Sequence, residues 1–236
     1  MVNEEDHIRE QCFLDGLNLK RAYDIISDID TELVDNLDIA YDEKLGFLTA
    51  CPSNVGTGLR ASVMMFLPGI VLTNNVDEMI NAVTPYGVCV RGCYGEGTSA
   101  NGYLFQISNQ ISLGKTEEEI VQLVESTALK IVELEKMALN NLLNNRYDDI
   151  KDEIYRDYGI LTNCYKISSE EAIEKLSKVK MGLNMGVIEI DNPHIIDQIL
   201  NNVSRVKINK MYGNDMDCNH RDICRAEYIR NALKEN

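Results

Sequence analysis

The chain has 236 residues, 44% of them apolar, with a formal net charge of −15 and a pI of about 4.6. This length is sufficient for one large domain or two modest ones with packed cores. The negative charge argues against general nucleic-acid binding and against docking on anionic membranes, because both favour a basic surface. Seven cysteines, without a CxxC motif, favour a reducing, cytoplasmic setting. The spacing of Cys218, His220 and Cys224 matches no common zinc pattern, so no metal site is predicted.

The first half of the chain alternates short β-type runs with turns. Strands are expected at residues 7–14, 47–50, 59–67, 88–91 and 103–108, and helices at 17–37 and 76–83. Regular βαβ alternation is missing. The pattern therefore predicts an α+β fold with a mostly antiparallel sheet flanked by helices, rather than a doubly wound sheet.

A helical region follows. Thr116 to Glu119 have the sequence of a capping box, and the residues behind them have the apolar spacing of a long amphipathic helix. From about residue 146 the pattern is helical, with helices expected at 147–158, 169–181, 193–203 and 221–233. We therefore predict two domains, an α+β domain over residues 1–145 and an all-helical domain over residues 146–236.

Residues 51–60, Cys-Pro-Ser-Asn-Val-Gly-Thr-Gly-Leu-Arg, form a turn with a thiol at its start and an arginine at its end. Gly56 and Gly58 permit backbone conformations that other residues rarely adopt, so backbone N–H groups can face a ligand. The Ser53 hydroxyl could hydrogen-bond the Cys51 sulfur and favour the thiolate. A buried, unreactive thiol is the competing interpretation, because free cysteines are among the most buried residues.

Arginines and carboxylates cluster at the predicted strand ends of this half. Glu4 and Glu5 precede Arg9, and Arg60 and Arg91 stand at the ends of a turn and a strand. Guanidinium groups bind phosphate oxygens bidentately, while carboxylates suit Mg²⁺ or accept a proton. The pattern points to phosphoryl transfer. Surface ion pairs and a solvated acidic turn are the competing interpretations.

The helical tail carries a second candidate site. Arg221 and Arg225 lie four residues apart on one face of the predicted helix, where they could clamp a phosphoryl group while Asp222 hydrogen-bonds a guanidinium. An ordinary surface helix with ion pairs would give the same spacing.

Four segments resemble, in order, the catalytic core of guanidino (phosphagen) kinases: Asn-Glu-Glu-Asp-His-Ile-Arg from residue 3, Cys-Pro-Ser-Asn-Val-Gly-Thr-Gly-Leu-Arg-Ala-Ser-Val from 51, Arg-Gly-x-Tyr-Gly-Glu from 91 and Ile-Ser-Asn-Gln from 107. Arg-Asp-x-x-Arg-Ala from residue 221 is similar to a motif of the bacterial protein-arginine kinases, the McsB branch. The resemblance implies transfer of the γ-phosphoryl group of ATP, with Mg²⁺, to arginine side chains of proteins, tuned allosterically by phosphoarginine.

The resemblance implies a role for each matched residue. Glu5 is the base that takes a proton from the substrate guanidinium, and Glu4 helps through metal-bound water. Cys51, as a thiolate, orients the guanidinium, and Glu96 closes over the acceptor. The implied ATP-binding residues are Arg9, Arg60, Ala61, Ser62, Val63, Met64, Arg91, Gly92, Cys93, Tyr94, Gly95 and Glu96. The implied phosphoarginine-binding residues are Arg221, Asp222, Arg225 and Ala226.

The resemblance also implies protein substrates with exposed arginines, an activator, partners in the stress-response protease system and a homodimer, with no nucleic-acid or membrane partner. In the family a Ser-x-Arg-x-Arg segment with further phosphate-binding arginines precedes the Asn-Glu-Glu-Asp segment, and we find none before Asn3. We therefore expect weak or no kinase activity for this polypeptide alone. The alternative is a catalytically impaired fragment that binds phosphoarginine or a partner through its tail.

Overall fold

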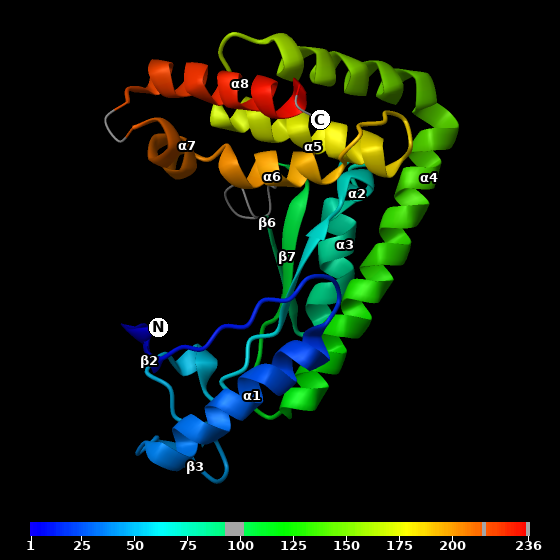
Figure 1. The fold of residues 1–236 in the computed structure, drawn as a ribbon. Helices are drawn as coiled ribbons and strands as arrows, with labels where there is room; N and C mark the ends of the chain where they lie inside the picture. The colour runs from blue at the N-terminus through cyan, green and yellow to red at the C-terminus, as the bar shows by residue number, and fades with distance from the viewer. Residues whose placement is uncertain (93–101, 214–215, 235–236) are drawn as a thin grey trace. The chain divides into compact units, whose positions relative to one another are not determined.

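The structure is a computed structural model that describes residues 1–92, 102–213 and 216–234 (Figure 1). The chain divides into two compact units. The first unit comprises Met1–Phe66, Asn74–Arg91 and Phe105–Lys136, and the second comprises Leu67–Thr73, Gly92–Leu104 and Met137–Asn236. Among the described residues, no helix has the length and apolar character needed to cross a membrane.

Two short hairpins and a three-stranded sheet supply the strands of the described part of the chain. The hairpins are antiparallel and pair β1 (Val2–Glu4) with β2 (Asp6–Ile8) and β3 (Tyr41–Asp42) with β4 (Gly46–Phe47). The sheet has the order β5-β7-β6, with bounds Ser62–Phe66 for β5, Val88–Gly92 for β6 and Leu104–Asn109 for β7. β7 is therefore the central strand.

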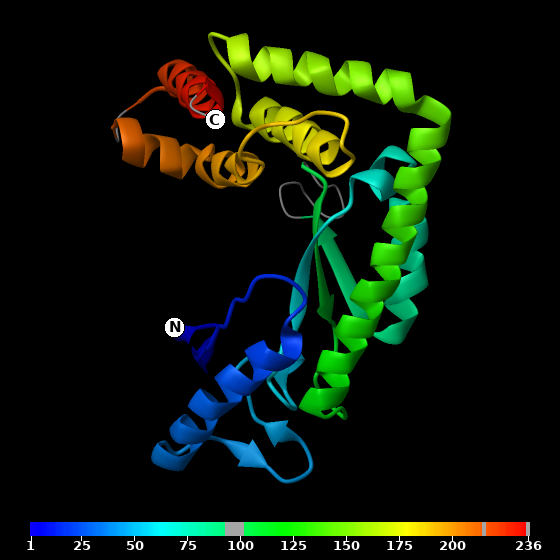
Figure 2. The ribbon, with the colours of Figure 1, turned by 45° about the vertical axis from the view of Figure 1, so that its right-hand side comes forward.

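The described part of the first unit also contains helical segments. They are α1 (Leu19–Asn36), α3 (Val76–Val83), the start of α4 (Glu117–Asn163) and the 3₁₀ turns η1 (Pro52–Asn54) and η2 (Thr84–Tyr86). Figures 1 and 2 show α3 and the first part of α4 beside the sheet. Ala61 packs in a buried cluster with Ile120 and Val124 of α4, so the residue that leads into β5 is fixed by the helix.

The start of α4 is the predicted capping box. The Thr116 amide donates to Glu119 Oε2 over 2.9 Å, and the Glu119 amide donates to Thr116 Oγ1 over 3.2 Å, so two orphan donors are satisfied reciprocally. At Arg146 the backbone leaves helical geometry (φ −140°, ψ 29°), which marks a kink in α4.

The second unit is a bundle of helices. With the end of α4 it contains α2 (Pro68–Leu72), α5 (Ser169–Asn184), α6 (His194–Asn202), α7 (Arg205–Tyr212) and α8 (Cys218–Lys234). Its core gathers fully buried aliphatic side chains such as Leu161, Leu176, Ile196 and Ile229. The Ser168 hydroxyl caps α5 by accepting the Glu171 amide.

The structure confirms the α+β class and corrects several bounds. The predicted strand at 7–14 is wrong beyond Ile8, and the one at 47–50 is reduced to the two residues of β4. The helix expected at 147–158 is the end of α4. α2 and α7 were not predicted.

Candidate functional site

Cys51 is half-buried at the start of η1 in the first unit. Its sulfur lies 3.0 Å from the Ser53 hydroxyl, which confirms the hydrogen bond predicted from their spacing. The thiol thus has a polar neighbour and partial solvent access. This environment does not match the competing interpretation of a sealed, unreactive cysteine.

Close backbone contacts fix the thiol turn. Gly56 has a φ of 118°, and its amide and carbonyl exchange hydrogen bonds with Phe47 over 3.3 and 2.8 Å. A Cβ at position 56 would stand 2.7 Å from the Leu113 Cα, so only glycine fits. The Ser112 hydroxyl donates to the Val55 carbonyl over 2.9 Å. The turn is therefore pinned to the segment that leads into α4.

Asp6 joins the acidic segment to the thiol turn. One carboxylate oxygen accepts the Cys51 amide over 3.1 Å, and the other accepts the Asn54 side-chain amide over 2.6 Å. Desolvation opposes ionisation, but hydrogen bonds from Asn54 and the Cys51 and Ala50 amides, with the nearby Arg9 charge, outweigh it and lower the pKa of Asp6. Sequence reasoning assigned no role to Asp6, although it belongs to the quoted Asn-Glu-Glu-Asp segment.

The predicted base lies at the tip of the β1–β2 hairpin. Glu5 is the one residue between paired Glu4 and Asp6, and its φ is 60°. Arg9 Nη1 lies 3.4 Å from a Glu5 carboxylate oxygen and 4.0 Å from one of Glu4. Both glutamates are well exposed, with side-chain accessibilities of 49% and 62%. Both carboxylates are therefore accessible to a substrate that approaches from solvent.

Arg60 and the start of β5 are held by the end of β7. Arg60 Nη2 donates to the Ser108 hydroxyl over 3.4 Å, and the Asn109 side-chain oxygen accepts the Ala61 amide over 2.9 Å. The Asn109 amide group also donates to the Leu59 carbonyl over 3.0 Å. Ser108 and Asn109 occur in the matched Ile-Ser-Asn-Gln segment, but sequence reasoning gave them no role.

The remaining predicted ATP-binding residues lie along β5 and at the end of β6. Ser62 accepts a hydrogen bond from Gln106 over 3.2 Å, while Met64 is exposed. Val63 packs against the Ala61 cluster, and the exposed Arg91 precedes Gly92 at the end of β6. Cys93, Tyr94, Gly95 and Glu96 lie outside the described residues.

The first unit thus brings the acidic hairpin and the thiol turn together through Asp6. The Arg60 guanidinium donates to Ser108 of β7, and among the described residues no ion pair or hydrogen bond joins it to Glu5 or Cys51. That these residues act in one site, as the family resemblance implies, stays a prediction.

The tail arginines occupy the buried side of α8. Arg225 is 1% exposed, and it donates from Nε to the Val203 carbonyl and from Nη1 to the Ile167 carbonyl, over 2.8 and 2.9 Å. The same Nη1 lies 2.5 Å from an Asp222 oxygen. Arg225 therefore ties α8 to two other segments of its unit.

Arg221 lies one turn earlier and is 6% exposed. Its Nη1 donates to the Met216 carbonyl over 3.3 Å and its Nη2 to the Cys218 sulfur over 3.0 Å. Ala226 is fully buried in the helical core. Phosphoarginine binding by these residues stays a prediction.

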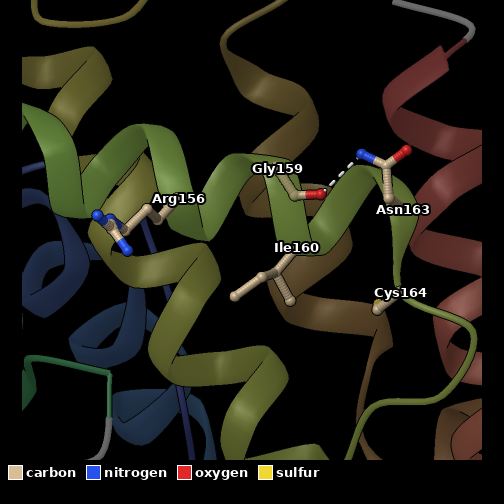
Figure 3. A pocket seen from close by; sticks show the side chains of 5 residues that line it. All are labelled: Arg156, Gly159, Ile160, Asn163 and Cys164. Carbon is tan, nitrogen blue, oxygen red and sulfur yellow. Dashed lines mark hydrogen bonds between the residues drawn. The ribbon is translucent and has the colours of Figure 1, made fainter.

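Two open hollows lie elsewhere. One, of about 460 Å³, lies on the end of α4 and is lined by Arg156, Gly159, Ile160, Asn163 and Cys164 (Figure 3). The other, of about 700 Å³, is in the first unit between residues 111–115 and the first turns of α4. Neither hollow is lined by a predicted site residue.

Comparison with known proteins gives two family matches. The model of the ATP:guanido phosphotransferase C-terminal catalytic domain matches residues 1–138, and that of the protein-arginine kinase McsB C-terminal domain matches residues 147–236. The protein-arginine kinase of Halothermothrix orenii is 44% identical over 99% of this chain and 67% of its own length. That of Clostridium kluyveri is 43% identical over 100% of this chain and 68% of its own length.

A solved structure agrees with these matches. The duplicated taurocyamine kinase from Schistosoma mansoni, with bound transition state analog components, superposes with a TM-score of 0.53. It is 27% identical, and the match covers 84% of this chain and 25% of that chain. Together with the matched segments and the acidic hairpin beside a thiol turn, these findings show that the chain belongs to the ATP:guanido phosphotransferase family, in its protein-arginine kinase branch.

Proposed function

We propose that the chain is an ATP-dependent protein-arginine kinase, which transfers the γ-phosphoryl group to arginine side chains of proteins and is tuned by phosphoarginine. The chain spans about two thirds of the length of the relatives it matches. The observation that carries the proposal is the Asp6 bridge, which fixes the Cys51 turn beside the hairpin that presents Glu4 and Glu5.

The acceptor chemistry needs a base and an orienting group. An arginine guanidinium is protonated at neutral pH, so one N–H proton must leave as the nitrogen attacks phosphorus. Glu5 takes that proton while the new N–P bond forms and the bond from the γ-phosphorus to the bridging oxygen breaks. Cys51 faces the acceptor as a thiolate and aims one guanidinium nitrogen in line with the γ-phosphorus. Such orientation can lower the barrier by roughly several kcal/mol.

The donor side needs cations for the phosphates of ATP. Arg60 offers a guanidinium whose position is set by Ser108, and exposed Arg91 stands at the end of β6. Arg9 is shared with Glu5 and Glu4 at 3.4 and 4.0 Å, so bound phosphate competes with those carboxylates for it. Planar guanidinium groups suit this role because they bind phosphate oxygens in pairs.

Mg²⁺ fits the exposed carboxylate of Glu4. This ion is usually bound by one or two carboxylates, water and substrate phosphates, so it needs no cage of protein ligands. When bound with ATP, the ion neutralises charge on the phosphates.

The net negative charge and the free cysteines support further proposals about substrates and cellular location. A net charge of −15 favours encounter with arginine-rich protein substrates. The described cysteines are free thiols, in keeping with a reducing cytoplasm. We also propose an activator, partners of the stress-response protease system and a homodimer, as the family resemblance implies.

Transfer of label from [γ-³²P]ATP to a basic, arginine-rich protein tests the function. The expected label is acid-labile, as an N–P bond requires, and it is lost in Cys51→Ala but kept in Cys89→Ala, a half-buried thiol of β6. Acid-stable label, or label that Cys51→Ala leaves unchanged, would refute the proposal.

A further inference from the structure

Asn109, the last residue of β7, binds three backbone groups with its side chain. Its Oδ1 accepts the Ala61 amide over 2.9 Å, and its Nδ2 donates to the Leu59 carbonyl over 3.0 Å and to the Ile111 carbonyl over 3.3 Å. The residue is 8% exposed, and all three partners belong to its own unit. The amide group therefore uses its acceptor and both of its donor hydrogens inside the fold.

Two of these hydrogen bonds lie on either side of Arg60. The Leu59 carbonyl belongs to the peptide group before the Arg60 Cα, and the Ala61 amide belongs to the peptide group after it. The backbone amide of Asn109 also donates to the Ala61 carbonyl over 3.3 Å. One residue thus holds both peptide groups between which the Arg60 side chain leaves the backbone.

Arg60 is exposed, whereas Ala61 is buried beside α4. The guanidinium has five N–H donors, and its Nη2 donates to the Ser108 hydroxyl over 3.4 Å, so further donors can meet phosphate oxygens. The rotamers open to such a side chain depend on its backbone dihedral angles. The placement of the guanidinium therefore depends on the backbone that Asn109 holds.

The third partner, Ile111, leads to the thiol turn. The Ser112 hydroxyl donates to the Val55 carbonyl over 2.9 Å, and Leu113 approaches Gly56 so closely that no Cβ fits there. The same amide group therefore fixes the predicted phosphate-binding arginine and the segment against which the thiol turn rests.

We propose that Asn109 is a positioning residue, which holds the Arg60 guanidinium for the phosphates of ATP at a fixed place relative to the thiol turn of Cys51. The inference rests on the proposed function, because that function assigns Arg60 to ATP and Cys51 to the acceptor. Phosphoryl transfer requires the two substrates to be aligned, and an error of about 1 Å can cost roughly 100-fold in rate. Asn109 contributes to this alignment through its hydrogen bonds to the backbone.

Asn109→Ala tests the inference, with Gln110→Ala as the matched control. Gln110 is the next residue in the chain and is exposed. Calorimetric titration with MgATP is expected to show about tenfold weaker binding for Asn109→Ala, because a misplaced guanidinium loses charged hydrogen bonds to phosphate, and no change for Gln110→Ala. Unchanged affinity in Asn109→Ala would overturn the inference. Asn109→Ser, which keeps a neutral polar group at this position, replaces Asn109→Ala if that variant does not fold.

A double variant separates positioning from general loosening of the fold. If Asn109 acts through Arg60, Asn109→Ala should weaken MgATP binding little further in an Arg60→Gln background, because the group that it misplaces is already gone. An equal loss of affinity in both backgrounds would mean that Asn109 acts elsewhere and would contradict the inference.

Hydrogen exchange gives a measurement that needs no nucleotide. The Gly56 amide, which donates to the Phe47 carbonyl over 3.3 Å, should exchange faster in Asn109→Ala. The Met79 amide of α3, which donates to the Asn75 carbonyl over 3.0 Å, should keep its rate. Wild-type protein that binds no MgATP would refute the proposed function, and the Gly56 amide would then decide the inference, since a rate equal to that of the wild type overturns it.

Discussion

One carboxylate, that of Asp6, accepts hydrogen bonds from two donors of the thiol turn. Its removal should therefore lower the stability of the fold. Asp6→Ala leaves the Cys51 amide and the Asn54 amide group without their acceptor. We expect a loss of about 1–3 kcal/mol in the free energy of unfolding at neutral pH, measured by urea denaturation. Asp28→Ala, an exposed carboxylate on α1, serves as the control.

The same carboxylate has a defined pH dependence. Because the folded state lowers the pKa of Asp6, its contribution to stability is present above the ordinary value of 3.8 and is lost as the pH falls through the lowered pKa. The stability difference between wild type and Asp6→Ala should therefore shrink in acid. A difference that stays constant into strong acid would mean that the charge of Asp6 contributes nothing.

Gly56 and Gly58 both have positive φ, but the structure gives them different tolerances. Gly56→Ala would place a methyl group 2.7 Å from Leu113 Cα and the Ser112 carbonyl oxygen, whereas a Cβ at Gly58 meets nothing within 4 Å. We expect Gly56→Ala to cost about 3 kcal/mol or more and Gly58→Ala about 1 kcal/mol, compared by thermal unfolding. Equal losses would contradict the close approach at Gly56.

At the scale of elements, the segment before α1 faces the helix through two carboxyl groups. Burial and the neighbouring Asp30 raise the pKa of Glu10, and burial with the charge of Glu117 raises that of Asp30. Groups with raised folded pKa values favour the fold at low pH and oppose it as the pH rises through those values. The contact between this segment and α1 is therefore weaker at neutral pH than in mild acid.

Glu10→Gln removes one of these charges. We expect it to raise the urea midpoint at pH 7 and to leave it nearly unchanged at about pH 4, where the carboxyl is already largely protonated. Glu32→Gln, which alters an exposed carboxylate of α1, is the matched control. A lower midpoint at pH 7 would mean that the Glu10 charge is stabilising.

Arg225 joins α8 to other segments of the second unit by hydrogen bonds, so its main effect is expected on stability. Arg225→Ala strips partners from the Val203 and Ile167 carbonyls and leaves Asp222 without its cation. We expect a loss of about 3–5 kcal/mol in the stability of the second unit, read by hydrogen exchange in α8. Arg205→Ala, at an exposed position of α7, should change stability by about 0.5 kcal/mol or less. Unaltered exchange in Arg225→Ala would contradict a fastening role.

At the scale of the whole molecule, local signals in the sequence predicted local structure. The periodicity of α1 and α3, the capping box of α4 and the Cys51–Ser53 contact all depend on residues a few positions apart. α2 was missed because it lies in a continuous apolar run, where periodicity cannot separate a strand from a helix.

Such local signals could not predict contacts between residues far apart in the sequence. Asp6 meets Cys51 across 45 positions, and Arg225 meets Ile167 across 58. The spacing of Arg221 and Arg225 predicted one shared helix face, but it could not show that the face is buried. The family resemblance located the segments, and the geometry added Asp6, Ser108 and Asn109.

The two units share α4, and this governs where a protease can cut. The helix passes the unit boundary between Lys136 and Met137 without a loop, and its backbone first departs from helical geometry at Arg146. Proteases need an extended substrate, so brief trypsin digestion should nick after Arg146 well before Lys136, with fragments identified by mass spectrometry. Early cleavage at Lys136 would mean that the helix opens there. Because the helix is continuous across the boundary, the first cut is expected after Arg146, ten residues beyond Lys136.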